Sequence, residues 1–111
     1  MINELRYDIL KTYFSCFFPG YYMYIEASSP RKQGETALLT SEEFFKTSSS
    51  GRCVKFWYHM YGSGIGALKV YYKTNSTKQV IWGLNGQQSA HLKDWKFGQA
   101  PIRSNVVYQV N

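Results

Sequence analysis

Residues 52–62 read RCVKFWYHMYG, and the order of residues in this stretch decides the fold class. β-Branched and aromatic residues dominate it, as they do in strands. Because successive side chains of a strand point to opposite faces, the stretch has one apolar face and one mixed face. The apolar set is Val54, Phe56, Tyr58 and Met60, and the mixed set is Lys55, Trp57 and His59. The pattern predicts a long strand over residues 52–61 with one face in a core.

Short β-rich segments separated by turn signals lie on either side of this stretch. Pro30 and Gly34 mark one turn, and Gly62-Ser63-Gly64 marks another. Asn85-Gly86 is a strong hairpin signal, because both turn positions favour positive φ. The predicted strands are residues 21–27, 36–41, 52–61, 67–73, 78–84, 93–99 and 105–110. This pattern is typical of an antiparallel all-β sandwich, with Trp82 near a sheet edge.

The first residues follow a different period. Leu5, Ile9, Leu10, Tyr13 and Phe14 recur at helical spacing with charged residues between them. This periodicity predicts a short amphipathic helix within residues 1–18 that ends at Pro19-Gly20. We therefore divide the chain into an N-terminal segment, residues 1–19, and a β domain, residues 20–111.

Composition limits the class of protein. The chain has 111 residues, enough for one domain, with 44% hydrophobic, 18% aromatic and 18% charged residues. That balance excludes disorder over most of the length. No apolar run reaches the roughly 20 residues of a spanning helix. The formal charge of +6 is spread without a basic run. A lysine-rich surface is therefore favoured over nucleic-acid binding, although basic chains also attract sulfated glycans and acidic membranes.

No motif in the sequence predicts catalysis, a metal site or a cofactor. Cys16 and Cys53 fit no zinc pattern, and they are either a disulfide pair or two thiols. His59 and His91 lack partners at ligand spacing, so packed side chains are the favoured interpretation. The adjacent Glu42-Glu43 would point to opposite faces of a strand. The glycines at 62, 64 and 66 lack the lysine and helix of a phosphate loop, and a hairpin turn explains them better.

Two features point to surface chemistry. Asn75-Ser76-Thr77 is an N-glycosylation acceptor if the chain is exported. The three tryptophans, Trp57, Trp82 and Trp95, could stack on sugars. The favoured interpretation is that they fill the core.

Several blocks together resemble the MAM domain family of meprins, neuropilins and receptor-type tyrosine phosphatases. They are YYMYIEASSP (21–30), CVKFWYHMYG (53–62), the I-G-x-L-x-V run from Ile65, Ile81-Trp82, Gly86-Gln87-Gln88, Trp95 and Tyr108-Gln109-Val110. The resemblance covers residues 20–110. It implies that the motif residues lie mainly in the core, namely Tyr22, Met23, Phe56, Trp57, Tyr58, Met60, Gly62, Trp82, Trp95 and Tyr108.

The resemblance also implies a jelly-roll-like sandwich and an extracellular, non-catalytic module without cofactors. Its partners would be proteins, homophilic contact included, and not nucleic acid. Adhesion or receptor assembly would be its role, and a carbohydrate-binding jelly roll is the alternative. Loops 28–36 and 46–52 are the first contact candidates.

Departures from the family pattern suggest a domain truncated at both ends. The family pairs the cysteine at the Cys53 position with one near the C-terminus of the domain, and the first residues of this sequence do not read as a signal peptide. We therefore expect an incomplete sandwich from a larger, membrane-anchored protein, marginally folded or prone to aggregate when isolated.

Overall fold

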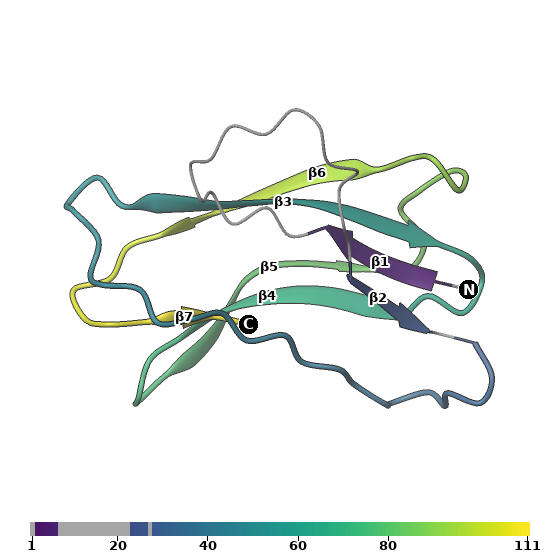
Figure 1. Cartoon of the computed structure of the whole chain (residues 1–111), viewed down its shortest axis with the longest axis horizontal. Coiled ribbons are helices and arrows are strands. Elements are labelled where there is room, and N and C mark those ends of the chain that lie inside the picture. The colour runs from purple at the N-terminus through teal and green to yellow at the C-terminus, as the bar shows by residue number, and fades with distance from the viewer. Residues whose placement is uncertain (1, 7–22, 27) are drawn as a thin grey trace.

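The computed structural model describes residues 2–6, 23–26 and 28–111. These residues form an all-β structure in two antiparallel sheets (Figure 1). The strands are β1 (Ile2–Arg6), β2 (Met23–Glu26), β3 (Arg52–Tyr61), β4 (Ala67–Lys73), β5 (Lys78–Asn85), β6 (Lys96–Ile102) and β7 (Gln109–Val110). The prediction of an antiparallel all-β sandwich is confirmed at this level.

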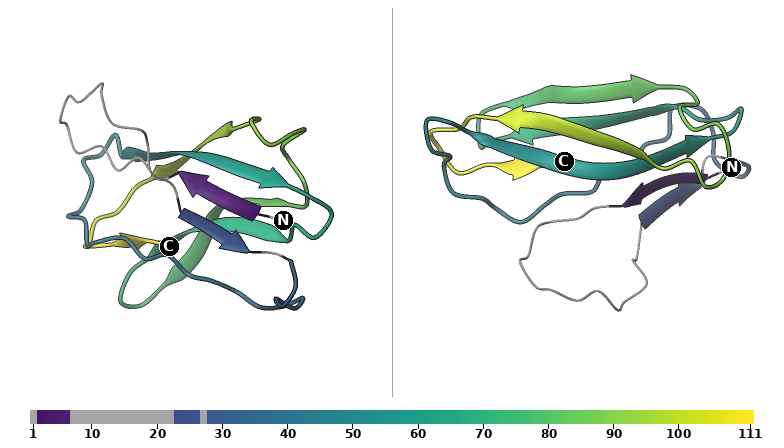
Figure 2. Two further views of the ribbon diagram at one scale, coloured as in Figure 1. Left: turned by 45° about the vertical axis from the view of Figure 1, so that its right-hand side comes forward. Right: turned by 90° about the horizontal axis from the view of Figure 1, so that it is seen from above.

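The longest strand organises the four-stranded sheet, whose order is β2-β1-β3-β6. The three-stranded sheet has the order β5-β4-β7 and packs against the first (Figure 2). The bounds of β3 and β4 agree with the sequence prediction, and β5 extends one residue further. Strand β5, which carries Trp82, is an edge strand, as expected.

The core lies between the sheets and is built on the apolar face of β3. Phe56, Tyr58 and Met60 are buried there, together with Val70 of β4. Trp82 reaches across from β5, with ring centroids 4.8 Å from Phe56 and 5.2 Å from Tyr58. Each such large side chain contributes about 2–3 kcal/mol when it is withdrawn from water. The alternation read from the sequence therefore assigns the buried face of β3 correctly.

The predicted N-terminal helix is wrong over the residues that the structure describes. Ile2–Arg6 form β1, which pairs with β2 on one side and β3 on the other. Backbone pairing with two neighbours here overrides the helical periodicity of a short segment. Residues 7–18 of the predicted helix lie outside the described residues.

The predicted strand at residues 36–41 is also wrong, because no ladder forms there. The backbone N–H of Ser41 donates to the carbonyl of Val110 (2.9 Å), and Phe44 exchanges two backbone bonds with Tyr108 (2.8 and 3.0 Å). Between these two contacts lie two residues on one side, Glu42 and Glu43, and a single residue on the other. Such a two-to-one arrangement is that of a β-bulge. The segment covers the free side of β7 with scattered bonds instead of a regular ladder.

Two predicted hairpin turns join the two sheets instead. Gly62 and Gly86 have positive φ, 124° and 77°, whereas the positive φ expected at Asn85 is not found. However, β3 and β4 belong to different sheets, and so do β5 and β6. The turn residues predict where the chain bends, but they do not predict which strands pair with each other. Because the chain forms a loop after Gly86, β6 begins at Lys96 and not at residue 93, where the predicted strand begins.

Candidate interaction surface

The outer face of the β3–β6 pair carries two exposed aromatic side chains in contact. Trp57 and Phe97 are opposite each other in the ladder, with ring centroids 5.4 Å apart in an edge-to-face arrangement. Trp57 is 42% exposed and Phe97 is 49% exposed. Lys55 and Gln99, the next pair on this face, are also exposed. Aromatic residues rimmed by polar ones are typical of protein contact surfaces.

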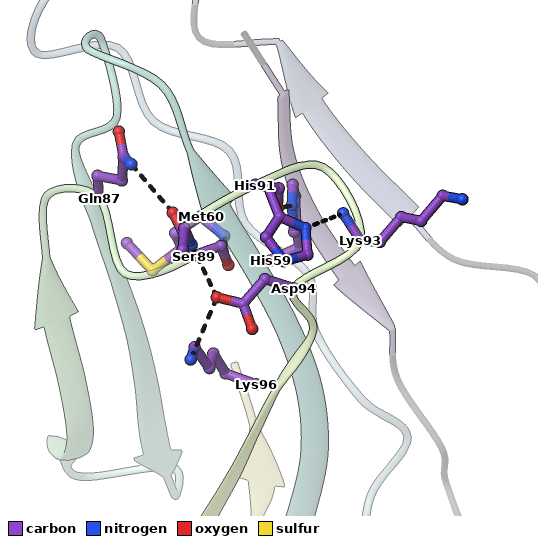
Figure 3. A network of polar contacts seen from close by, with 9 residues as sticks. His59, Met60, Gln87, Ser89, His91, Lys93, Asp94 and Lys96 are labelled. Atoms are coloured by element: carbon purple, nitrogen blue, oxygen red, sulfur yellow. Dashed lines mark hydrogen bonds and ion pairs between the residues drawn. The ribbon is translucent and has the colours of Figure 1, made fainter.

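The same face is covered further along β3, at His59. Its side chain is 2% exposed, its Nε2 lies 2.9 Å from the carbonyl oxygen of His91, and its ring lies 5.5 Å from that of Trp95. The loop between β5 and β6, residues 86–95, provides this cover (Figure 3). The open part of the face therefore begins at Trp57.

Backbone and side-chain bonds hold this loop on the end of β3. The carbonyl of Met60 accepts from the backbone N–H groups of Gln88 and Ser89, both at 2.9 Å. The backbone N–H of Met60 donates in turn to the Ser89 hydroxyl at 3.1 Å. The GQQ motif of the sequence thus begins a loop that closes one end of the sandwich (Figure 3).

Asp94 is the acid that shapes this loop. Its carboxylate accepts from the backbone N–H of Ala90 (2.7 Å) and pairs with Lys96 (3.2 Å). The Ala90 bond first, and the Lys96 bond second, lower the pKa of Asp94. Likewise, bonds from the hydroxyl and then the backbone N–H of Ser28 lower the pKa of Glu26. Each carboxylate fixes a local turn, which gives it a structural role.

The opposite end of the sandwich has a polar hollow. The backbone N–H of Thr47 donates to the carbonyl of Ser104 (2.8 Å), and the backbone N–H of Ser104 donates to the Thr47 hydroxyl (3.1 Å). These bonds join the loop before β3 to the segment after β6. The hollow between them has a volume of about 450 Å³ and is lined by Lys46, Thr47, Ser48, Ser49, Arg103, Ser104 and Asn105.

The two loops proposed from the sequence as contact candidates do not meet. Loop 46–52 lies at the left end of the sandwich in Figure 1, next to the connection between β6 and β7. Loop 28–36 turns at the right-hand end, and the chain then runs the length of the molecule to reach the other loop. A single partner footprint of small size cannot include both.

The family-motif residues fall into three environments. Phe56, Tyr58, Met60 and Tyr108 are buried, and Trp82 packs partly buried against them. Trp95 lies on His59, and Gly62 makes a turn. The expected core position is wrong for Trp57, which is 42% exposed because it lies on the outer face of β3. Met23 belongs to β2, while Tyr22 lies outside the described residues. The three tryptophans therefore do not form one sugar-stacking platform.

The predicted modification residues lie on the surface. Cys53 is a free, exposed thiol at the start of β3, and Cys16 lies outside the described residues. Asn75 is exposed in the β4–β5 turn, which the Thr74 backbone N–H closes on the Thr77 carbonyl at 2.8 Å. Both positions are accessible to a partner or an enzyme.

Phe97 is the surface residue that sequence reasoning missed. It lies inside a predicted strand, and alternation alone could have placed it on one face with Trp95 and Gln99. Its contact with Trp57 depends on the register of β3 against β6, which a single sequence does not contain.

Neither a metal cluster nor a membrane-crossing helix is found in the part of the chain that the structure describes. No three His, Cys, Asp or Glu side chains of that part are grouped to hold a metal ion. That part also contains no helix long and apolar enough to cross a bilayer.

Comparison with known proteins adds family evidence. The family model described as "MAM domain, meprin/A5/mu" matches residues 9–111. MAM domain-containing glycosylphosphatidylinositol anchor protein 1 of Gallus gallus is 34% identical over 94 residues, which are 82% of this chain. Anchor protein 2 of Mus musculus is 35% identical over 95 residues, 77% of this chain. Neuropilin-1 of Rattus norvegicus is 36% identical over 95 residues, 82% of this chain. The chain spans about a tenth of the length of these relatives. No solved structure matches it.

Proposed function

Because the chain belongs to the MAM domain family, we propose that it is a non-catalytic, extracellular interaction module of a larger, membrane-anchored protein. The names of two relatives include a glycosylphosphatidylinositol anchor, which supports a place at the cell surface. In this proposal the domain is a jelly-roll-type sandwich that serves adhesion or receptor assembly by binding proteins, including further copies of itself.

The exposed Trp57–Phe97 contact is the observation that carries the proposal. Large aromatic side chains lose little conformational entropy on binding and dominate the energy of many interfaces. Here the pair lies on two neighbouring strands of a sheet, so the backbone fixes its position. Lys55 and Gln99 provide a polar rim beside it. Such a preformed patch binds a partner without first being ordered.

Sedimentation equilibrium of the full chain tests this surface. Trp57→Ser with Phe97→Ser should weaken self-association at least tenfold, about 1.4 kcal/mol. Leu92→Ser is the control, because Leu92 is 72% exposed and belongs to the β5–β6 loop, not to the β3–β6 ladder that carries Trp57 and Phe97. Loop variants in 28–36 and 46–52 form two further arms. A wild-type chain that stays monomeric would reject homophilic contact, and equal association of all variants would reject the Trp57–Phe97 face.

A second candidate, sugar binding, rests on Trp57 alone. Trp82 and Trp95 pack on protein rings, so Trp57 is the tryptophan with a half-exposed ring. A neutral glycan that stacks on it should quench fluorescence saturably, and Trp57→Ser should remove the change. Absence of quenching across a glycan panel would dismiss this candidate.

We also propose covalent modification at the two exposed positions. Asn75 is presented in a tight turn and would carry an N-linked glycan in a secreted chain. Cys53 would form a disulfide with a cysteine outside the described residues. Mass spectrometry of the secreted protein, before and after glycosidase or reductant, tests both modifications.

A further inference from the structure

Positive charge is concentrated in one part of the chain. Of the thirteen lysines and arginines, nine lie within residues 44–111, which contain one of the seven acids, Asp94. Asp94 is paired with Lys96 in the loop that covers His59. The hollow at the other end is lined by Lys46 and Arg103 and by no acid, which favours an anionic ligand.

The lining of the hollow matches this charge with hydrogen-bonding groups. Its seven residues comprise two cations, four hydroxyl side chains and one amide. Among the described residues, the side chains of Lys46, Ser49, Arg103 and Asn105 make no hydrogen bond or ion pair with one another or with their neighbours, so their donors are available. No aromatic or aliphatic residue lines the hollow. A ligand held there would meet charged and hydrogen-bonding groups together with the carbon stems of these side chains.

The backbone fixes both cation-bearing segments. Thr47 and Ser104 are joined by reciprocal hydrogen bonds, and Ser104 is anchored to Tyr72 of β4 at 2.8 Å. Gly51 has a φ of +79°, and a Cβ there would lie 2.7 Å from the carbonyl oxygen of Ile102 and 3.0 Å from Cγ of Arg103. The loop thus packs directly against the stem of Arg103, so the two sides of the hollow are held in place.

We propose that this hollow binds a sulfated glycan, with Lys46 and Arg103 contacting sulfate oxygens and the hydroxyl and amide side chains contacting the sugar. The planar guanidinium of Arg103 can bind two oxygens of a sulfate at once. An acidic peptide would offer carboxylates to the two cations but few hydroxyl groups to the four hydroxyl side chains and the amide, so it would use less of this lining. A volume of about 450 Å³ accommodates a short sugar unit. The site is separate from Trp57–Phe97 and goes beyond the proposed function.

Titration of the full chain with a heparin octasaccharide tests the site. Lys46→Gln with Arg103→Gln should weaken binding about tenfold. Lys32→Gln with Lys93→Gln is the control, because it lowers the net charge by the same two units from exposed positions outside the hollow. The control pair should change the affinity less than about threefold, and Arg103→Lys should be intermediate because it keeps the charge but loses the fork.

Competition experiments test which chemical groups of the ligand the hollow recognises. Chemically desulfated heparin should bind at least tenfold more weakly than heparin, and polyglutamate of equal charge should compete poorly. The proposal is overturned if the wild-type chain does not bind heparin, if the two double variants weaken binding equally, or if polyglutamate competes as well as heparin. All four substituted side chains are exposed, so their replacement should leave the fold intact. Melting curves of each variant check this.

Discussion

Gly98 shows how a single missing side chain shapes the core. It lies in β6 opposite Phe56, and a Cβ there would lie 2.5 Å from Cε2 and Cζ of that ring. Phe56 is 2% exposed and packs on Trp82, so it cannot move aside freely. We expect Gly98→Ala to lower the free energy of unfolding by about 1–3 kcal/mol, as over-packing does. Urea unfolding measures this loss.

Gly66→Ala is the control for that substitution, because a Cβ at Gly66 would meet nothing within 4 Å. Adding Phe56→Leu to Gly98→Ala should cost less than the two single losses combined, since the shorter side chain relieves the clash. An additive result would show that the ring does not limit residue 98.

The lowered pKa of Asp94 predicts how the stability of the fold depends on pH. Its lowered pKa means that the carboxylate stabilises the folded loop at pH values above the usual aspartate pKa of 3.8. This contribution is lost as the pH falls through the native value. We expect Asp94→Asn to be less stable than wild type at pH 6 and to lose less stability between about pH 4 and pH 2. Thermal melts across that range measure the difference, and parallel curves would contradict it.

Individual strands could be predicted from the sequence, while their pairing could not. The stretches around Phe56, Val70 and Trp82 show strong β-patterning, and β3, β4 and β5 form there. Residues 36–41 look equally β-rich, yet the segment runs beside β7 with a bulge at Glu42 and Glu43. Sheet membership depends on contacts distant in sequence, which no local signal encodes. The Trp57–Phe97 surface could not be predicted either, because it depends on the pairing of β3 with β6.

Ser104 joins two elements of the sandwich, because it lies in the connection that follows β6 and contacts Tyr72 of β4. Its hydroxyl donates to the Val106 carbonyl at 2.7 Å, and the Tyr72 hydroxyl lies 2.8 Å away. Ser104 is 7% exposed, so its removal leaves partners unpaired away from water. We expect Ser104→Ala to cost about 1–3 kcal/mol in urea unfolding. Tyr72→Phe should add little on top of it, and a full additional loss would show that the two hydroxyls are not coupled.

At the scale of the whole molecule, the two sheets form a flat body. The radius of gyration is 15.2 Å and the principal extents are 42 × 38 × 20 Å. A compact domain of this length has a radius of about 13 Å. Several large apolar side chains are also exposed, Phe45 at 82% and Leu38 at 64% among them. These features support the expectation of a marginally stable isolated chain that associates through its surfaces.

The distribution of charge predicts how salt affects this flat molecule. Two ion pairs, Arg31–Glu35 and Asp94–Lys96, join described residues to each other. Most lysines and arginines of residues 44–111 therefore repel one another without a paired acid from that region. Folding brings these cations closer together than they are in the unfolded chain, and the Debye length falls from about 30 Å at 0.01 M salt to about 8 Å at 0.15 M. We therefore expect the melting temperature to rise by a few degrees as sodium chloride increases over that range. Lys69→Glu with Lys73→Glu should reduce the rise, because it places negative charge among the cations of β4. A melting temperature that falls with added salt would mean that attractive ion pairs outweigh this repulsion.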